Sequence, residues 1–236
     1  MIWYQKLTQQ PRLHVLALGL LLAAPDAPAG RPLTVDDATI ADAGNCQLET
    51  WHEAGGGQRA NWAMPACNFT GNLELGLGLQ TLHTSQDASE RTSQSLTLQG
   101  KTMLRPLTDD GWGAALVLAH QGGAQAASSI NLPVSLAWHG QDTLLHANLG
   151  ANRAHGAATA ATWGLALEQQ LGAATVVSLE RYGQQSARSS TQLGLRHEVL
   201  PGRLQLDASW GRHSSHSGQQ DHLWSLGLVW TGRALQ

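Results

Sequence analysis

The sequence predicts an all-β protein: an antiparallel up-and-down β-barrel of about twelve strands that crosses a membrane. Three observations lead to this fold class. Apolar and polar residues alternate along most of the chain, about twelve alternating segments follow one another, and the connections between them alternate between short and long. Alternation gives a sheet two unlike faces, and an even number of strands joined by unequal turns is typical of a barrel with two different ends.

The strands are expected in order along the chain, each bounded by glycine, proline or polar turn residues. In the clearest case Leu204, Leu206, Ala208 and Trp210 alternate with polar or small residues. Tight connections such as LPGR, residues 200–203, alternate with longer polar ones such as GQQSARSS, residues 183–190. With a boundary error of about two to four residues, the segments are 48–53, 61–67, 71–82, 93–105, 111–120, 132–139, 142–150, 161–171, 174–182, 190–199, 202–212 and 222–231.

The apolar face of the barrel is expected to point outward, toward lipid, and the polar face toward the lumen. Twelve strands enclose a polar interior rather than a packed core, and segments of about ten residues cross hydrocarbon at a tilt. Tryptophans at the ends of the apolar faces match the aromatic girdles of the two membrane surfaces, whereas core tryptophans, the alternative, would lie mid-strand as often. The expected girdle residues are Trp112, Trp138, Trp163, Trp210, Trp224 and Trp230.

The N-terminus has the three parts of a secretory signal peptide. Lys6 and Arg12 give a basic start, an apolar run follows from Leu13 to Ala24, and small residues precede Gly30. A disordered apolar leader or a membrane anchor is the alternative. The sequence therefore predicts a signal peptide over residues 1–29, a polar segment over 30–45 that lies in the periplasm or plugs the lumen, and the barrel over 46–236.

The two cysteines, Cys46 and Cys67, flank an expected hairpin centred near Gly56 and Gly57. Antiparallel pairing about that centre would bring the cysteines together, and a secreted protein meets an oxidising compartment. We expect a disulfide. Two free thiols are the alternative, because the sequence does not show the geometry of the Cβ atoms.

Composition excludes several classes of partner. The chain has 14 Lys and Arg against 17 Asp and Glu, a formal charge of −3, and no basic cluster, so nucleic acid is not an expected partner. The 11 histidines have no spacing typical of metal ligands, so we expect no metal site, and no glycine-rich loop precedes a helix to hold a cofactor.

Charged residues of both signs are expected to line the lumen. Arg196 and Arg203 lie on neighbouring strands together with Glu198 and Asp207, and opposite charges on adjacent strands can pair. The functional interpretation is a charged constriction that selects solutes, and the structural one is a closed lumen crossed by salt bridges. The expected lumen residues are Glu49, Glu74, Lys101, His139, His146, Glu168, Glu180, Arg196, Glu198, Arg203 and Asp207.

An enzyme is a competing hypothesis. His213 and Ser215 stand two residues apart, a spacing that puts both side chains on one face of a strand, where the imidazole could accept the serine proton. Asp221 or His222 could orient that imidazole. However, His213 shares the face assigned to the lumen, whereas a lipid hydrolase needs its nucleophile at the lipid boundary.

The mature N-terminus carries a resemblance to a known family. The residues Arg31-Pro32-Leu33-Thr34, Asp36-Asp37-Ala38, Gly44 and Glu49 resemble the start of the outer-membrane proteins named for the meta-cleavage pathway of phenol degradation. The stretch MPACNFTGNLELGLG, residues 64–78, is similar to an uncharacterised proteobacterial branch with paired cysteines. The resemblance implies an outer-membrane β-barrel that moves small molecules, and it supplies no catalytic residues.

We therefore expect a narrow channel or transporter for small solutes in a bacterial outer membrane, with no enzymatic activity. Its partners would be outer-membrane lipid and lipopolysaccharide, the barrel-assembly machinery and a small solute of unknown identity. The alternatives are a non-conducting structural or binding barrel, and a lipid-modifying hydrolase that uses His213 and Ser215.

Overall fold

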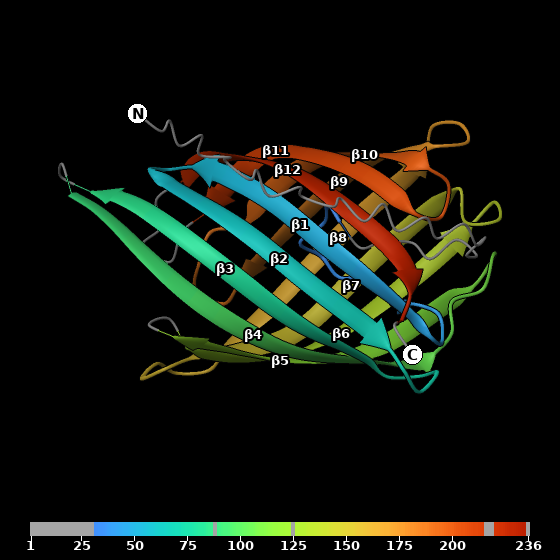
Figure 1. Ribbon diagram of the computed structural model, residues 1–236, viewed down its shortest axis with the longest axis horizontal. Helices are drawn as coiled ribbons and strands as arrows, with labels where there is room; N and C mark the ends of the chain where they lie inside the picture. Colours follow the sequence, from blue (N-terminus) through green and yellow to red (C-terminus); the bar gives the residue numbers. More distant parts are fainter. Residues whose placement is uncertain (1–30, 87–88, 124–125, 215–219, 235–236) are drawn as a thin grey trace, which may run out of the picture.

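The computed structural model describes residues 31–234 except 87–88, 124–125 and 215–219, and they form a closed antiparallel barrel (Figure 1). Each strand pairs with its neighbours in sequence, and β1 pairs with β12 to close the sheet. All twelve predicted segments overlap these strands, so the predicted fold class is confirmed. The strands are β1 (Asn45–Gly55), β2 (Gln58–Asn68), β3 (Glu74–Gln86), β4 (Ser89–Arg105), β5 (Trp112–Gly123), β6 (Ala127–Trp138), β7 (Thr143–Ala154), β8 (Ala160–Gln170), β9 (Thr175–Gln184), β10 (Ser190–Leu200), β11 (Leu204–Ser214) and β12 (Gln220–Arg233).

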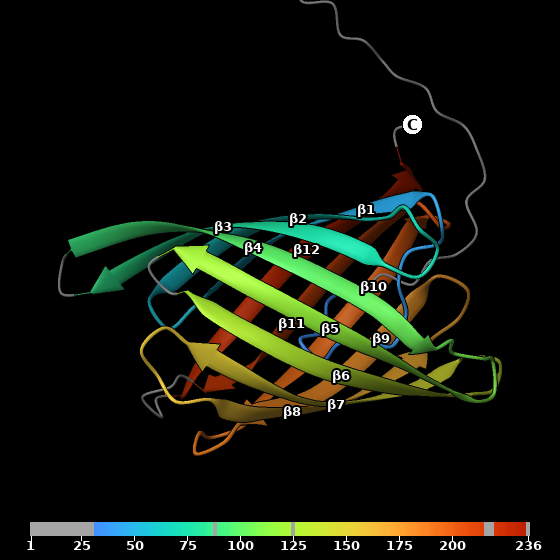
Figure 2. The same ribbon diagram turned by 90° about the horizontal axis from the view of Figure 1, so that it is seen from below.

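The barrel has two ends that we name by the chain. At the terminal end, β1 begins and β12 ends, with Asn45 paired to Arg233. At the distal end, the β1–β2, β3–β4 and later odd-to-even hairpins turn, and the β3–β4 hairpin projects beyond the others (Figure 2). No helix in the described part of the chain is long and apolar enough to cross a membrane.

The expected alternation of short and long connections is wrong. Gly56 and Gly57 alone join β1 to β2, where a long loop was expected, and both have positive φ as a two-residue hairpin turn requires. The polar residues at the strand ends continue the ladder of backbone hydrogen bonds, because pairing uses main-chain groups whatever the side chain. The distal hairpins therefore lengthen strands rather than loops.

The two faces of the sheet are inverted relative to a soluble protein. On β11, Leu206 and Trp210 are 47% and 57% exposed, while Gln205 and Asp207, the neighbours of Leu206 in sequence, are 7% and 5% exposed. Leucines are exposed on the outer face of the other strands in the same way, except on β2, which has none, and the largest fully buried side chains include the polar residues His146, Glu180, Asn68 and Ser135. The molecule thus has an apolar exterior and a polar interior.

All six tryptophans expected in girdles are exposed on the outer face. Trp112, Trp138 and Trp230 lie near the terminal end of their strands. The other three, Trp163, Trp210 and Trp224, lie near the distal end, and Trp210 pairs in register with Trp224. The outer leucines therefore lie between two groups of indoles.

A disulfide joins Cys46 to Cys67. The two residues are register partners on β1 and β2, near the terminal end. Because side chains alternate along a strand, Cys46 shares the outer face with Leu48. The disulfide therefore closes the first hairpin from outside and does not enter the lumen.

Candidate functional site in the lumen

Residues 31–44, which we call the N-terminal segment, lie inside the barrel (blue in Figures 1 and 2), and they bond to side chains on most of its strands. The segment adds no strand to the sheet. Apart from Gly44, whose N–H donates to the carbonyl of Asn68 and whose carbonyl accepts the N–H of Ala234, its main-chain groups bond mainly to side chains of the inner face. Thr34 and Val35 donate their backbone N–H groups to the carboxylate of Glu180, at 2.8–3.0 Å. Ala41 donates its N–H to Glu74 at 2.8 Å.

Neutral side chains hold the middle of the segment. Asn148 accepts the N–H of Asp36 at 2.8 Å and donates its amide to the carbonyl of the same residue at 2.7 Å. Ser135 accepts the N–H of Ala38 at 2.9 Å, and its hydroxyl lies 2.7 Å from Nδ1 of His146. These contacts meet the need of buried backbone groups for hydrogen-bond partners, which strands elsewhere supply through the sheet.

Two cations bind the segment to the wall by charge. Lys101 lies 2.6 Å from the Asp36 carboxylate and 3.2 Å from that of Asp37. Burial by itself would raise the pKa of the Asp37 carboxyl, but Lys101, together with His146, holds that pKa below its usual range. Asp37 therefore remains ionised at neutral pH and supplies the counter-charge that buried Lys101 needs.

Arg31 makes the second charged contact, in the opposite direction. Its guanidinium lies 2.9 Å from Asp207 of β11 and donates to Ser225 of β12 at 3.1 Å. The same guanidinium lies 4.4 Å from the ring centroid of Trp51, a cation–π contact. The segment therefore supplies the cation of one ion pair, that of Arg31 with Asp207. It supplies the anions of the other, that of Asp36 and Asp37 with Lys101.

Glycines of the inner face make room for the segment. A Cβ added at Gly164 would lie 2.7 Å from Cγ2 of Val35, and one at Gly194 would lie 2.7 Å from Cγ of Pro32. By contrast, the nearest atom to an added Cβ at Gly76 is 3.5 Å away, in Met64 of β2. Gly164 and Gly194 therefore form notches in which the side chains of the segment sit.

A cluster of charges fills the lumen toward the terminal end. Arg196 of β10 lies 3.0 Å from Oε2 of Glu168 of β8, and Nε2 of His146 lies 3.9 Å from the same oxygen. The sequence indicated that opposite charges among Arg196, Glu198, Arg203 and Asp207 can pair across adjacent strands. Asp207 pairs instead with Arg31 of the N-terminal segment, and Arg196 pairs with Glu168, two strands away. The cavity beside this cluster is only about 10 Å³.

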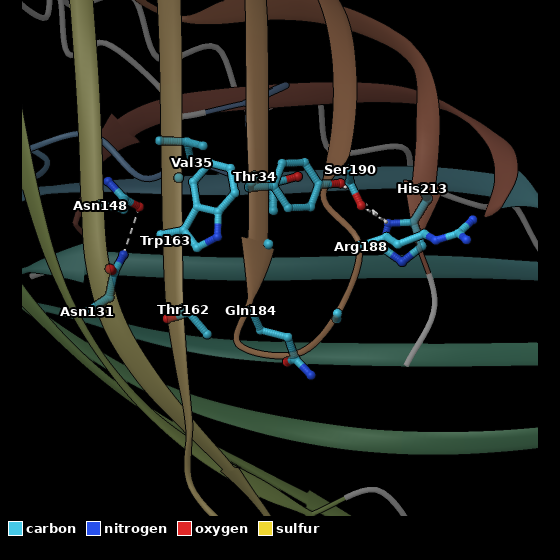
Figure 3. A pocket seen from close by; sticks show the side chains of 14 residues that line it. Thr34, Val35, Asn131, Asn148, Thr162, Trp163, Gln184, Arg188, Ser190 and His213 are labelled. Atoms are coloured by element: carbon cyan, nitrogen blue, oxygen red, sulfur yellow. Dashed lines mark hydrogen bonds between the residues drawn. The ribbon is translucent and has the colours of Figure 1, made fainter. Parts of the chain in front are cut away.

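Three larger cavities lie in the lumen, and two of them are on the distal side of the segment. A cavity of about 280 Å³ is lined by Thr34, Val35, Tyr182 and His213, among others (Figure 3). A second, also about 280 Å³, shares Asn131 with the first and lies along the segment. The third, of about 320 Å³, shares further lining residues with the second. Empty space therefore lies between the segment and the distal end, and also along the segment, where Glu74 and Lys101 line the second cavity.

The structure places most of the predicted lumen residues on the inner face of strands. Two of the predicted residues lie in turns instead. His139 lies in the β6–β7 turn with φ 55° and an exposed side chain, because β6 ends at Trp138, so its assignment to the lumen wall is wrong. Arg203 lies in the β10–β11 turn. The inner-face residues are Glu49, Glu74, Lys101, His146, Glu168, Glu180, Arg196, Glu198 and Asp207.

Two groups of lumen residues were not predicted from the sequence. The first is the charges of the segment itself, Arg31, Asp36 and Asp37, which no strand pattern connects to a wall position. The second is Trp51 and Trp62, which face inward. Alternation could have found this orientation, because Trp51 stands two residues after Glu49, already assigned to the lumen.

The structure describes only one of the two candidate residues of the hydrolase hypothesis. His213 is on the inner face, with Nδ1 3.4 Å from Oγ of Ser190 and 3.5 Å from the hydroxyl of Tyr182 (Figure 3). Ser215 lies outside the described residues. The described contacts therefore place His213 in the first cavity, of about 280 Å³, beside Tyr182 and Ser190, which the hypothesis did not include.

Comparison with known proteins gives one family and a set of similar folds. The model of a family described as uncharacterised conserved protein UCP029691 matches residues 17–228. No curated protein sequence matches the chain. The COG4313 outer membrane channel from Pseudomonas putida F1 is similar in structure, with a TM-score of 0.62 at 11% identity, covering 83% of this chain and 98% of that one.

Two porins have similar folds. The KdgM porin in complex with disordered oligogalacturonate has a TM-score of 0.61 at 9% identity, covering 80% of this chain and 99% of its own. The NanC porin has a TM-score of 0.57 at 6% identity, covering 78% and 98%. At these identities the likeness establishes the barrel architecture.

Proposed function

Since the chain belongs to the family of uncharacterised conserved proteins whose model matches residues 17–228, we propose that this protein is a narrow outer-membrane channel for small solutes. We propose further that the N-terminal segment is a plug that obstructs its lumen. The outer-membrane channels and porins of similar fold support the first part, and the contacts of the segment support the second.

The inverted barrel is the observation that carries the channel. A soluble protein does not expose leucines over a whole barrel surface, because apolar area is costly in water. Hydrocarbon removes that cost, and the tryptophans near both ends of the strands suit its two interfaces. Inside, ionised and amide side chains border cavities of about 280–320 Å³, a lining that suits the passage of water and polar solutes.

The plug follows from how the N-terminal segment is held. Side-chain contacts, rather than strand pairing, attach the segment to the wall, so it can leave while the barrel ladder stays intact. The secretory signal peptide over residues 1–29 would deliver such a chain to the periplasm, where the barrel-assembly machinery inserts it among lipid and lipopolysaccharide. The resemblance of residues 31–49 to the phenol meta-pathway family favours small organic molecules as solutes.

Conductance in a planar bilayer tests both parts. The refolded mature protein is compared with a variant that lacks residues 31–43, and insertion is checked by the mobility shift between unboiled and boiled samples. We expect small or rare steps from the mature protein and larger, sustained steps from the deletion variant. If neither inserted protein conducts, the channel proposal is wrong. If the two proteins conduct equally, the plug proposal is wrong.

A further inference from the structure

Two tryptophans face the lumen and have no role in a membrane girdle. Trp51 of β1 and Trp62 of β2 are register partners, and their rings stack with centroids 5.1 Å apart and planes 10° from parallel. The described tryptophans of the outer face interact with lipid in the proposed function, whereas this pair stands on an otherwise polar wall. An apolar aromatic surface in a polar lumen calls for a partner with an apolar face.

The tryptophan pair borders the third of the larger cavities, of about 320 Å³, which lies on the distal side and which we call the tryptophan cavity. No charged side chain lines it in the described part of the chain, in contrast to the neighbouring cavity that contains Lys101 and the segment carboxylates. Its polar lining consists of hydroxyl and amide groups, from Thr97, Gln99, Gln121, Ser129 and Asn152.

One polar atom beside the tryptophan cavity lacks a partner. Oδ1 of Asn152 is buried and accepts no hydrogen bond from the described residues. A buried amide oxygen without a donor is unfavourable, so a ligand hydroxyl or a water is needed there. Rotation of this amide would present it to the space that Trp62 also borders.

These groups together define the chemistry of a ligand. A sugar ring has an apolar face of C–H groups that stacks on an indole, and a rim of hydroxyls that exchange hydrogen bonds with amides and hydroxyls. The Arg31 guanidinium beside Trp51 is already paired with Asp207, and the Glu53 carboxylate accepts the indole N–H of Trp62. A ligand carboxylate would therefore meet a like charge and an occupied cation, which is costly away from water. A phenol could stack on the indole, but its single hydroxyl would leave most of the five polar side chains without a partner.

We propose that the tryptophan cavity is a binding site for the ring of an uncharged sugar, with the indole of Trp62, which is backed by the stacked ring of Trp51, as the stacking platform. The inference rests on the proposed function in that it names a solute class for the channel. The site lies on the distal side, which faces the outside of the cell when both chain ends lie on the periplasmic side, as in outer-membrane barrels with an even number of strands. It also meets the plug, because the guanidinium of Arg31 lies over Trp51.

The test measures binding of glucose to the folded full-length mature protein by isothermal titration calorimetry, in a detergent without a sugar headgroup. Glucuronate provides the same ring with a negative charge, and phenol provides an aromatic ring with one hydroxyl. We expect saturable binding of glucose, with weaker binding of glucuronate and of phenol. Tighter binding of either of these, or no saturable binding of glucose, would overturn the proposal.

Substitutions locate the binding. Trp62→Leu removes the indole, and we expect glucose to bind about tenfold more weakly, which corresponds to about 1.4 kcal/mol. Trp62→Phe keeps an aromatic face and should retain most of the affinity. Trp230→Leu, on the outer face, is the matched control and should bind glucose like the unmodified protein. Equal affinity in Trp62→Leu and the control would overturn the site, and the mobility shift on boiling verifies that each variant is folded.

Binding in detergent does not depend on passage, so the two proposals fail separately. Glucose binding by a protein that never conducts would support the sugar site and contradict the channel proposal. Conductance without glucose binding would support the channel proposal and contradict the sugar site.

Discussion

The two halves of the lumen differ in how they are filled. Toward the terminal end, Arg196, Glu168 and His146 form a charged cluster, and the cavity beside them is about 10 Å³. Toward the distal end, the lumen contains cavities of about 280–320 Å³ lined largely by neutral polar and aromatic side chains. The N-terminal segment lies between these two regions.

This difference shows that strands with the same side-chain pattern can enclose both a filled and a partly empty half of the lumen. Both halves use the same alternation of outward leucine and inward polar residue, so the strand pattern does not distinguish them. The distinction comes from the side chains that meet inside and from the segment that crosses the lumen. A solute could enter the distal half freely, but passage through the terminal half requires movement of the segment or the charged cluster.

The largest effect is expected from Lys101→Met, which removes one of the two cations that bind the segment to the wall, the other being Arg31. Asp36 and Asp37 would be left without their partner, at a cost of about 3 kcal/mol, so the segment should detach and the two halves should become one pore. Planar-bilayer conductance should rise to that of the variant lacking residues 31–43. Conductance equal to that of the unmodified protein would show that Lys101 does not hold the plug.

A smaller effect is expected from Gly194→Ala, which fills the notch for Pro32. The added methyl would clash with the Pro32 ring and with Ser178, and overpacking of this kind costs about 1–3 kcal/mol. We expect more frequent opening in single-channel recordings. Gly76→Ala is the control on the same inner face, because its Cβ would meet only ordinary contacts. If both variants open equally often, the notch has no part in holding the segment.

Arg196→Ala should change selectivity more than conductance. It removes a positive charge from the terminal half and leaves Glu168 without its partner at 3.0 Å. The negative carboxylate should then favour cations, and the permeability ratio from the reversal potential in a salt gradient should shift severalfold toward them. Gln99→Ala, in the distal half, should leave that ratio unchanged. An unaltered ratio in Arg196→Ala would place the selective region elsewhere.

The smallest effect on transport is expected from removal of the disulfide, in Cys46→Ser with Cys67→Ser. The bond closes a sequence separation of 21 residues on the outer face, and its loss costs about 3 kcal/mol of stability on the chain-entropy account. The temperature at which the unboiled band disappears should fall, while single-channel conductance should not change. A changed conductance would mean that the first hairpin shapes the lumen.

Much of the barrel was predictable because its main signal is local. A period of two fixes which side chains share a face, so the outward position of Leu206 and Trp210 and the inward position of Glu180 follow from neighbouring residues alone. The lengths of the distal connections were not predictable from side-chain polarity, since polar residues such as those of β4 also pair as strands. The roles of the inward residues were not predictable either. Glu180 was expected in the lumen, but its bonds to backbone N–H groups of residues 34 and 35 required the fold.

The sequence by itself determined a twelve-stranded barrel with leucine outside and polar groups inside, because the alternation of side chains is fixed by the geometry of every strand. Only the tertiary structure decided which lumen charges pair and where the lumen is empty. The partner of Asp207 is Arg31, 176 residues away and outside any strand, so no periodic pattern connects the two. Closure of the barrel brings such residues together, and the N-terminal segment then supplies the counter-charges and divides the space.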